Sequence, residues 1–201
     1  MIDIRRILAI PAVYKLSRQI VWSPQKFSSY VDTFIKPKTG ERMLDIGCGT
    51  ADIVDYLHDV AYFGIDTSQM YIDLATKRFG HRARFRCSSA TGNPIAGEEP
   101  FDIVLAQGVL HHLNDDDAKA LLRLAQGALK PGGRLITLDG CYTNGQPWIA
   151  KYLLSKDRGK HVRPPEEYVK LASGFFSNIG TSIREDFLRF PYTLVIMQCS
   201  N

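Results

Sequence analysis

The sequence predicts an α/β fold with a seven-stranded, mostly parallel sheet. Between residues 42 and 139, short apolar runs typical of buried strands alternate with segments of helical spacing. A glycine turn, Gly47–Gly49, follows the first of these strands. The last two expected strands, 181–189 and 192–199, are separated only by Phe190 and Pro191, which predicts a tight hairpin. Alternating strands and helices form parallel sheets, and the hairpin makes one C-terminal strand antiparallel.

The N-terminal region predicts helices that cover the sheet. Residues 2–21 have the spacing of one or two short helices, and a further helix is expected over 26–35. The uncharged run from Ile7 to Tyr14 is too short to span a bilayer, and no convincing signal-peptide cleavage site follows it. A weak contact of this region with a membrane surface remains an open possibility.

The remaining elements follow in order along the chain. The expected strands are 42–46, 62–66, 84–87, 101–106 and 134–139, and the expected helices are 51–58, 68–79 and 115–129. Asn114 and the three aspartates after it are a strong helix start, because the amide oxygen caps the helix and the acids favour its first turn. Residues 141–163 predict an irregular or partly helical insertion, and a helix runs from Pro165 to about Phe176.

Length and composition indicate one domain. The 201 residues contain 45% hydrophobic and 23% charged residues, and the net charge is +4 without a dense basic run, so a nucleic-acid partner is not expected. Four scattered cysteines without a CxxC pair argue against a disulfide framework or a zinc site, and favour reduced thiols in a cytoplasmic protein. We expect residues 1–201 to form one domain, with an N-terminal lid (1–40), a ligand-binding core (41–140) and a substrate-side insertion with the hairpin (141–201). The oligomeric state is not indicated.

The glycine turn predicts a binding site for a polar ligand. Gly47 and Gly49 lack a Cβ, so a ligand can approach the backbone closely. The free N–H groups of the helix expected at 51–58 would favour a carboxylate or a phosphate there.

Four segments together carry a family resemblance. They are LDIGCGTAD at 44–52, GIDTSQM at 64–70, FDIVLAQGVLHHL at 101–113 and LKPGGRLITLD at 129–139. In this order and at this spacing the sequence resembles the class I S-adenosylmethionine-dependent methyltransferases, especially their small-molecule "type 11" branch. The resemblance implies a Rossmann-like enzyme that binds S-adenosylmethionine and releases S-adenosylhomocysteine.

The resemblance also implies the residues that contact the cofactor. These are Asp45, Gly47, Cys48, Gly49, Asp66, Thr67, Met70, Ser89, Ala90 and Gln107. Asp66 ends its strand 17 residues after Gly49, where a carboxylate can accept hydrogen bonds from both ribose hydroxyls. Ser89 stands where the family usually has an acid against the adenine amine, and Asp52 stands where a G-x-G-x-x-G motif would have its third glycine.

The sequence indicates less about the residues that bind the methyl acceptor. Methyl transfer is an in-line displacement, and a base is needed only for an acceptor, such as a hydroxyl, that must lose a proton. His112 and Asp139 follow strand ends and are the catalytic candidates, although His111 and His112 could simply be a helix-start pair. No metal ligands are expected. The basic residues of the insertion could clamp an anionic group; they are Arg158, Lys160, His161 and Arg163.

The main interpretation is therefore methyl transfer to a small molecule, with a hydroxyl as the expected acceptor. One alternative is an S-adenosylmethionine-binding regulator without catalysis. A less favoured alternative is an NAD-dependent oxidoreductase, because the third glycine and a second substrate domain are missing. Nucleic-acid methylation is also disfavoured, because the segment AQGVL lacks the Asn/Asp-Pro-Pro-aromatic signature.

Overall fold

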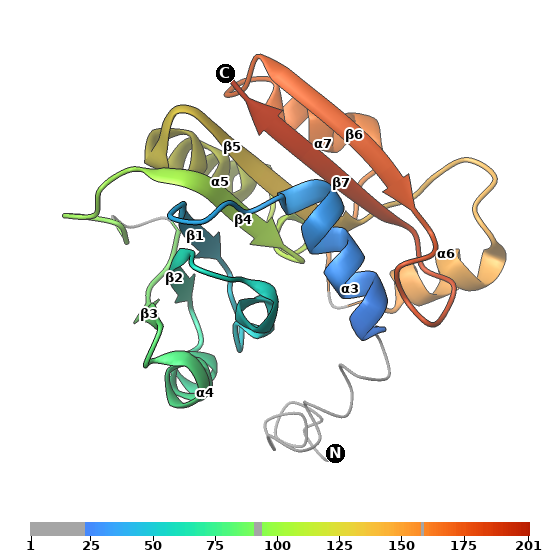
Figure 1. Cartoon of the computed structure of the whole chain (residues 1–201). Coiled ribbons are helices and arrows are strands. Elements are labelled where there is room, and N and C mark those ends of the chain that lie inside the picture. The colour runs from blue at the N-terminus through green and yellow to red at the C-terminus, as the bar shows by residue number, and fades with distance from the viewer. Residues whose placement is uncertain (1–22, 91–93, 158) are drawn as a thin grey trace.

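A seven-stranded sheet with the order β3-β2-β1-β4-β5-β7-β6 forms the centre of the molecule (Figure 1). The computed structural model describes residues 23–90, 94–157 and 159–201. The strands are β1 (Arg42–Ile46), β2 (Ala61–Asp66), β3 (Ala83–Cys87), β4 (Phe101–Gln107), β5 (Leu129–Gly140), β6 (Asn178–Arg184) and β7 (Leu194–Ser200). The first five strands pair in parallel, and β7 is antiparallel to both β5 and β6. The predicted fold class is confirmed.

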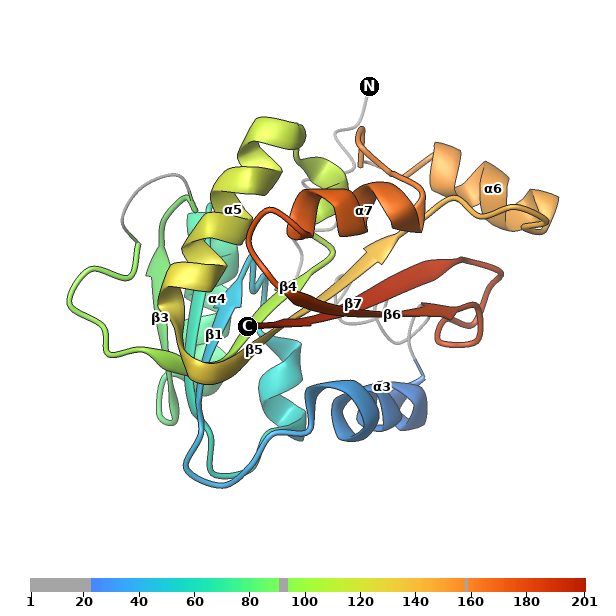
Figure 2. The same cartoon turned by 90° about the horizontal axis from the view of Figure 1, so that it is seen from above.

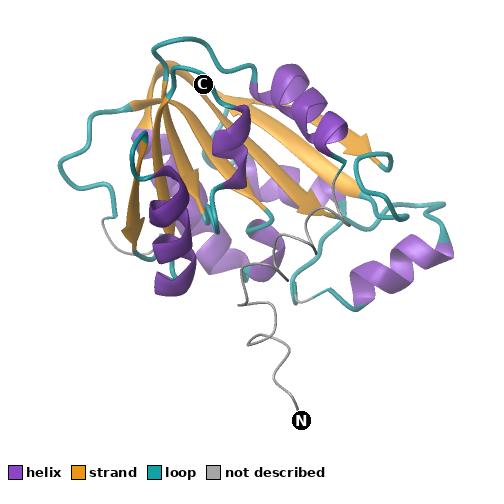
Figure 3. Cartoon of the chain, turned by 60° about the horizontal axis from the view of Figure 1, so that its bottom comes forward, coloured by secondary structure: helices purple, strands orange, loops and turns teal. Residues whose placement is uncertain are grey.

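Helices cover both faces of the sheet. They are α3 (Pro24–Tyr30), the π-helical turn η1 (Val31–Ile35), the 3₁₀ helices η2 (Asp52–Tyr56) and η3 (Leu110–His112), α4 (Gln69–Phe79), α5 (Asp115–Ala128), α6 (Trp148–Ser155) and α7 (Pro165–Ala172). Helices α5 and α7 lie on one face and α3 lies on the other (Figure 2). Successive side chains of β4 point to opposite faces, so Ile103 and Leu105 pack with α3 whereas Val104 and Ala106 pack with α5. Helix α6 lies at the periphery of the molecule (Figure 3), although its Leu154 is buried in the same core cluster as α3.

Local chemistry explains where the predicted helices begin. The side chain of Asn114 accepts a hydrogen bond from the Asp117 N–H at 2.9 Å, which confirms it as the N-cap of α5. Pro165 opens α7 in its first turn, as expected. The helices expected over 2–21 lie outside the described residues. In the described part of the chain, no helix is long and apolar enough to cross a bilayer.

The expected helix over 51–58 is wrong. Only the five-residue 3₁₀ helix η2 forms there, because Ala51 adopts a left-handed backbone conformation with φ of 55°. The Ala51 N–H donates to the carbonyl of Cys48 at 2.9 Å and so tightens the turn. The row of free helical N–H groups predicted for an anionic ligand is therefore absent from this turn, and any ligand there must rely on other groups.

The C-terminal strands pair as predicted, but the tight hairpin is wrong. Strand β6 ends at Arg184, and the connection covers 185–193 rather than Phe190 and Pro191 alone. Phe187 and Leu188 leave the sheet because their side chains are buried against α3. The Phe187 ring packs edge-on against Tyr30, with ring centroids 5.8 Å apart. Burial of this aromatic pair thus overrides the strand pattern.

Candidate active site

Two cavities open side by side at the carboxyl ends of the parallel strands. The first, of about 780 Å³, is named here the Asp66 cavity, and the second, of about 450 Å³, the His111 cavity. Both are lined by Gly47, Gly49 and Gly108. A ligand could therefore extend from one cavity to the other along backbone that carries no side chains. This is the edge where ligands bind in open α/β sheets.

Steric contact requires glycine at the junction of the cavities. Gly47 has φ of 76°, and a Cβ added there would lie 2.5 Å from Cγ2 of Val109. Gly108 has φ of 68°. The N–H groups of Gly47 and Cys48 both donate to the carbonyl of Ile65, at 2.8 and 3.0 Å. The turn after β1 is thus bound to β2 and packed against the segment after β4.

Asp66 connects the glycine turn to the start of α4. Its Oδ2 accepts the Gly49 N–H at 2.9 Å and its Oδ1 accepts the Ser68 N–H at 2.8 Å. Each carboxylate oxygen has two lone pairs, so both can accept a further hydrogen bond from a ligand in the cavity. Asp66 therefore both orders the turn and lines the larger cavity.

The other predicted cofactor residues divide between the two cavities. Thr67, Ser89 and Ala90 line the Asp66 cavity, and Asp45, Cys48 and Gln107 line the His111 cavity. Met70 lines neither of these two cavities, and its side chain is 40% exposed. The neighbouring Tyr71 lines the Asp66 cavity instead.

Buried hydrogen bonds position the inner wall of the His111 cavity. The Tyr62 hydroxyl donates to Oδ2 of buried Asp45 at 2.6 Å. Burial and the Asp45 charge raise the pKa of Tyr62, so the phenol keeps its proton and acts as the donor. The Gln107 amide donates to the Tyr30 hydroxyl at 3.1 Å, which connects this wall to α3. Burial raises the pKa of Cys48, so its thiol is not ionised at neutral pH.

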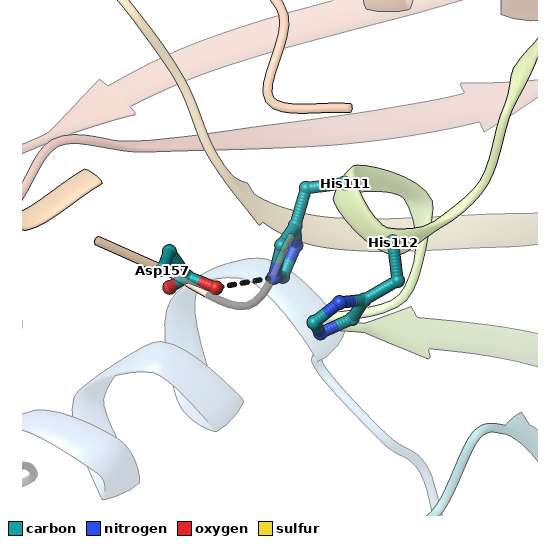
Figure 4. A group of neighbouring side chains, drawn as sticks. All are labelled: His111, His112 and Asp157. Carbon is teal, nitrogen blue, oxygen red and sulfur yellow. Dashed lines mark ion pairs between the residues drawn. The ribbon is translucent and has the colours of Figure 1, made fainter. Parts of the chain in front are cut away.

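His111 lies between the carboxylates of Asp139 and Asp157, the second of which is drawn in Figure 4. Its Nδ1 is 2.9 Å from Oδ1 of Asp139, and its Nε2 is 3.6 Å from Oδ1 of Asp157. Burial lowers the pKa of His111, but the two carboxylates outweigh burial and raise the pKa to about 9. In this arrangement the imidazole is protonated at neutral pH, and its Nε2 faces the cavity wall formed by Asp157.

Asp157 is held by three groups. Its Oδ1 accepts the Gly159 N–H at 2.9 Å, and its Oδ2 accepts the Tyr192 hydroxyl at 2.5 Å. Burial raises the pKa of Asp157, but the bonds from His111 and Tyr192 outweigh it and hold the pKa well below its usual range. A Cβ added at Gly159 would lie 2.1 Å from Cδ2 of His111, so this segment packs directly on the imidazole.

The catalytic candidates from the sequence occupy different places. Asp139 is buried and reaches the cavity only through His111, since its Oδ1 accepts both the backbone N–H and the ring Nδ1–H of that residue. His112 is exposed and lines the Asp66 cavity. The catalytic role of His112 stays a prediction. His111, Asp157 and Tyr192 are not among the site residues predicted from the sequence, and the structure brings all three to one cavity.

The proposed anion clamp is wrong for Arg163. This buried guanidinium donates to the carbonyls of Leu110, His161 and Leu113, at 3.1, 2.9 and 2.7 Å, and to Oδ1 of Asp115 at 2.8 Å. Its donors are thereby committed to the loop that carries His111. Arg158 lies outside the described residues.

Comparison with known proteins gives a consistent result. Residues 43–133 match a family described as "Methyltransferase domain". A wheat (Triticum aestivum) protein named phosphoethanolamine N-methyltransferase 1 is 29% identical over 160 residues, which cover 76% of this chain and 32% of the relative. An O-methyltransferase of Pyrenophora dematioidea is 33% identical over 121 residues, which cover 56% of this chain and 44% of the relative. The matched residues thus span less than half the length of either relative.

Solved structures show the same fold. A TehB-like SAM-dependent methyltransferase from Corynebacterium glutamicum superposes with a TM-score of 0.65 at 20% identity, and the match covers 88% of both chains. Phosphoethanolamine N-methyltransferase 2 of Haemonchus contortus, solved with phosphomonomethylethanolamine and S-adenosylhomocysteine, gives a TM-score of 0.70 at 17% identity. That match covers 89% of this chain and 53% of the other. At such low identity these structures support the fold rather than a substrate.

Proposed function

This chain carries a class I S-adenosylmethionine-dependent methyltransferase domain, and on that premise we propose that it methylates a hydroxyl group of a small molecule. The observation that carries the proposal is the pair of cavities joined at Gly47, Gly49 and Gly108. Such an arrangement lets a donor and an acceptor meet from opposite sides, as an in-line displacement requires.

The donor spans the junction of the two cavities. Asp66 would accept hydrogen bonds from its ribose hydroxyls, and Thr67, Ser89 and Ala90 would line its adenine in the Asp66 cavity. Its amino-acid end passes the glycines, where Asp45 can accept from the ammonium group. S-adenosylmethionine has this combination of a ribose and an amino-acid tail. Because η2 offers no long row of free N–H groups, side-chain carboxylates contribute more to binding than a helix dipole.

The acceptor occupies the outer part of the His111 cavity. Polar contacts are available from His111, Asp157 and Tyr192, and an apolar wall is formed by Phe27 and Phe190. Phe27 belongs to α3, so this helix acts as part of the expected lid over the site. A buried, oriented imidazolium suits a hydroxyl acceptor, because it can hold the oxygen by donating a hydrogen bond while the proton of the hydroxyl leaves to solvent as the C–O bond forms. The O-methyltransferase relative agrees with this choice, whereas the wheat relative is named for N-methylation.

The four cysteines support the proposed cytoplasmic location. All four are free thiols, although Cys87 is exposed. Free thiols persist in a reducing compartment.

The decisive experiment separates donor binding from turnover. We expect calorimetry to show S-adenosylhomocysteine binding, and a panel of hydroxyl and amine acceptors to show methylation of a hydroxyl compound. His111→Gln should lower turnover by about 100-fold, the range for a residue that positions or activates an acceptor, with donor affinity unchanged. His81→Gln is the matched control, because His81 is exposed and lines neither cavity. Methylation of amines alone would refute the hydroxyl assignment, and equal turnover of the two variants would remove His111 from the acceptor site.

A further inference from the structure

Three potential metal ligands meet where the two cavities adjoin. The side chains of His111, His112 and Asp157 each offer one donor atom, and these atoms all lie within 4.8 Å of one another (Figure 4). His111 and Asp157 line the His111 cavity, whereas His112 lines the Asp66 cavity. We propose that these three residues bind a divalent transition-metal ion such as Zn²⁺, which in turn binds the oxygen of the methyl acceptor. This inference rests on the proposed function for its catalytic meaning, but not for the metal binding itself.

The spacing of the donor atoms suits an ion. His111 Nε2 and Asp157 Oδ1 are 3.6 Å apart. Ligands bound to Zn²⁺ at about 2.0–2.2 Å in tetrahedral geometry lie roughly 3.3–3.6 Å from one another. The rings of the two histidines are also close, with centroids 4.1 Å apart. The three donor atoms therefore lie within reach of one ion.

The groups behind the ligands are those expected of a metal site. A metal-binding histidine commonly donates its second ring N–H to a carboxylate, which orients the ring. Asp139 does this for His111, at 2.9 Å from Nδ1, so Nε2 is the atom that faces the site, and a bound ion would displace the Nε2 proton to solvent. The proposed carboxylate ligand, Asp157, is also held in place, because it accepts hydrogen bonds from Gly159 and Tyr192. Both inner ligands are thus preorganised.

The donor set selects the class of ion. Two imidazole nitrogens and one carboxylate oxygen favour Zn²⁺, Fe²⁺, Co²⁺ or Ni²⁺ over Mg²⁺, which prefers oxygen ligands. Three protein ligands leave at least one coordination position for water or for the acceptor. His112 is exposed and Asp157 is partly exposed, so this open position can be reached from solvent. Because the ligands lie up to 46 positions apart in the chain, no compact metal-binding motif is visible in the sequence.

An ion at this position would have a direct chemical consequence. A hydroxyl bound to a divalent ion loses its proton more readily, and that proton leaves to solvent. The oxygen lone pair then forms the new C–O bond with the methyl carbon, while the C–S bonding pair remains on sulfur. The products are the methyl ether and S-adenosylhomocysteine, so neither an oxidant nor a reductant is needed.

Metal binding can be measured without any turnover. Chelator-treated full-length protein would be titrated with ZnCl₂ by calorimetry and with CoCl₂ by visible absorption, whose intensity reports the coordination geometry. We expect one ion per chain. His112→Ala should weaken binding at least about 100-fold, because loss of a direct ligand exceeds the usual effect of losing an outer-shell group. Since His112 is exposed, this variant should fold, and circular dichroism would verify it. His81→Ala is the matched control and should bind both ions like the parent protein.

The results distinguish this inference from the proposed function. Failure of both ions to bind, or equal binding by the His112→Ala and His81→Ala variants, would overturn the metal site. Donor binding is followed separately, by calorimetry with S-adenosylhomocysteine on the metal-free protein. Donor binding with metal-independent methylation would leave the proposed function intact and remove the metal. Absence of donor binding would instead refute the proposed function, while the metal titration would still decide the site.

Discussion

At the scale of single residues, Asp66 has two tasks. Its carboxylate already accepts hydrogen bonds from Gly49 and Ser68, and it also lines the cavity assigned to the nucleoside. Both tasks follow from its place at the carboxyl end of β2, beside the turn after β1. A substitution there should consequently affect both the shape of the turn and the ligand.

Asp66→Ala should weaken binding of S-adenosylhomocysteine by about 1.5–3 kcal/mol, the usual value of hydrogen bonds to a charged group. This corresponds to a dissociation constant raised roughly 10- to 150-fold. Calorimetry on the purified variant measures it directly. Asp73→Ala is a suitable control, since Asp73 is exposed on α4 and lines neither cavity. An affinity for the Asp66 variant equal to that of the control would exclude Asp66 as the ribose contact.

The sequence predicted some site residues well because strand ends are visible in it. Asp45, Asp66 and Gln107 each lie at or near the end of an apolar run, and the topology then brings them to one edge. Asp157 carries no such signal, because it follows α6 in an irregular insertion. His111 and His112 are adjacent, so the sequence does not show which of them pairs with Asp139. Tertiary packing decides this, because it buries His111 against Asp139 and leaves His112 exposed.

At the scale of elements, the segment 159–163 holds the loop that carries the histidines. The His161 N–H donates to the carbonyl of His111 at 2.9 Å, and Arg163 donates to Leu110 and Leu113 on either side. Spacing predicted most strands and helices within a few residues, since apolar periodicity is local. It could not predict this segment, or the early end of β6, because both depend on contacts distant in sequence.

Arg163→Ala should lower the free energy of unfolding by about 2–4 kcal/mol, because it leaves one buried and two partly buried carbonyls without their donor. It should also reduce turnover, since the His111 loop would lose its support. Thermal and urea unfolding measure the first effect. Arg123→Ala is the comparison: Arg123 is exposed on α5 and contacts the Phe175 ring, so a loss of at most about 1 kcal/mol is expected. Equal losses in the two variants would contradict the role given to Arg163.

At the scale of the whole molecule, ion pairs gather at the amino ends of the strands, opposite the cavities. Glu98 pairs with Arg84 in two-pronged geometry, at 2.6 and 3.2 Å, and also lies 3.6 Å from both Arg42 and Arg86. The Arg84 hydrogen bonds outweigh burial and hold the pKa of Glu98 below its usual value of 4.5. The folded protein therefore binds this proton less readily than the unfolded chain does.

Because folding lowers the pKa of Glu98, the free energy of unfolding decreases in acid. The contribution of Glu98 is complete at neutral pH and is lost as the pH falls below 4.5 through the lowered pKa. Glu98→Gln should cost about 1 kcal/mol at pH 7, a typical value for a well-oriented arginine–carboxylate pair, and less at pH 3. Urea unfolding between pH 3 and pH 7 tests this. Glu99→Gln, next in the chain with a side chain 82% exposed, should have little effect at either pH. A cost for Glu98→Gln that does not shrink in acid would disprove the assignment.

The three glycines at the junction of the two cavities, Gly47, Gly49 and Gly108, have one more consequence. Glycines have no side chains that can tell one acceptor from another, so selectivity must reside in the outer wall, where Phe190 and Tyr192 come from the connection 185–193 between β6 and β7. Loops of this kind tolerate sequence change more readily than strand ends do. Evolution, or an engineer, can thus exchange the molecule being modified by altering that wall while the methyl-donor half stays as it is.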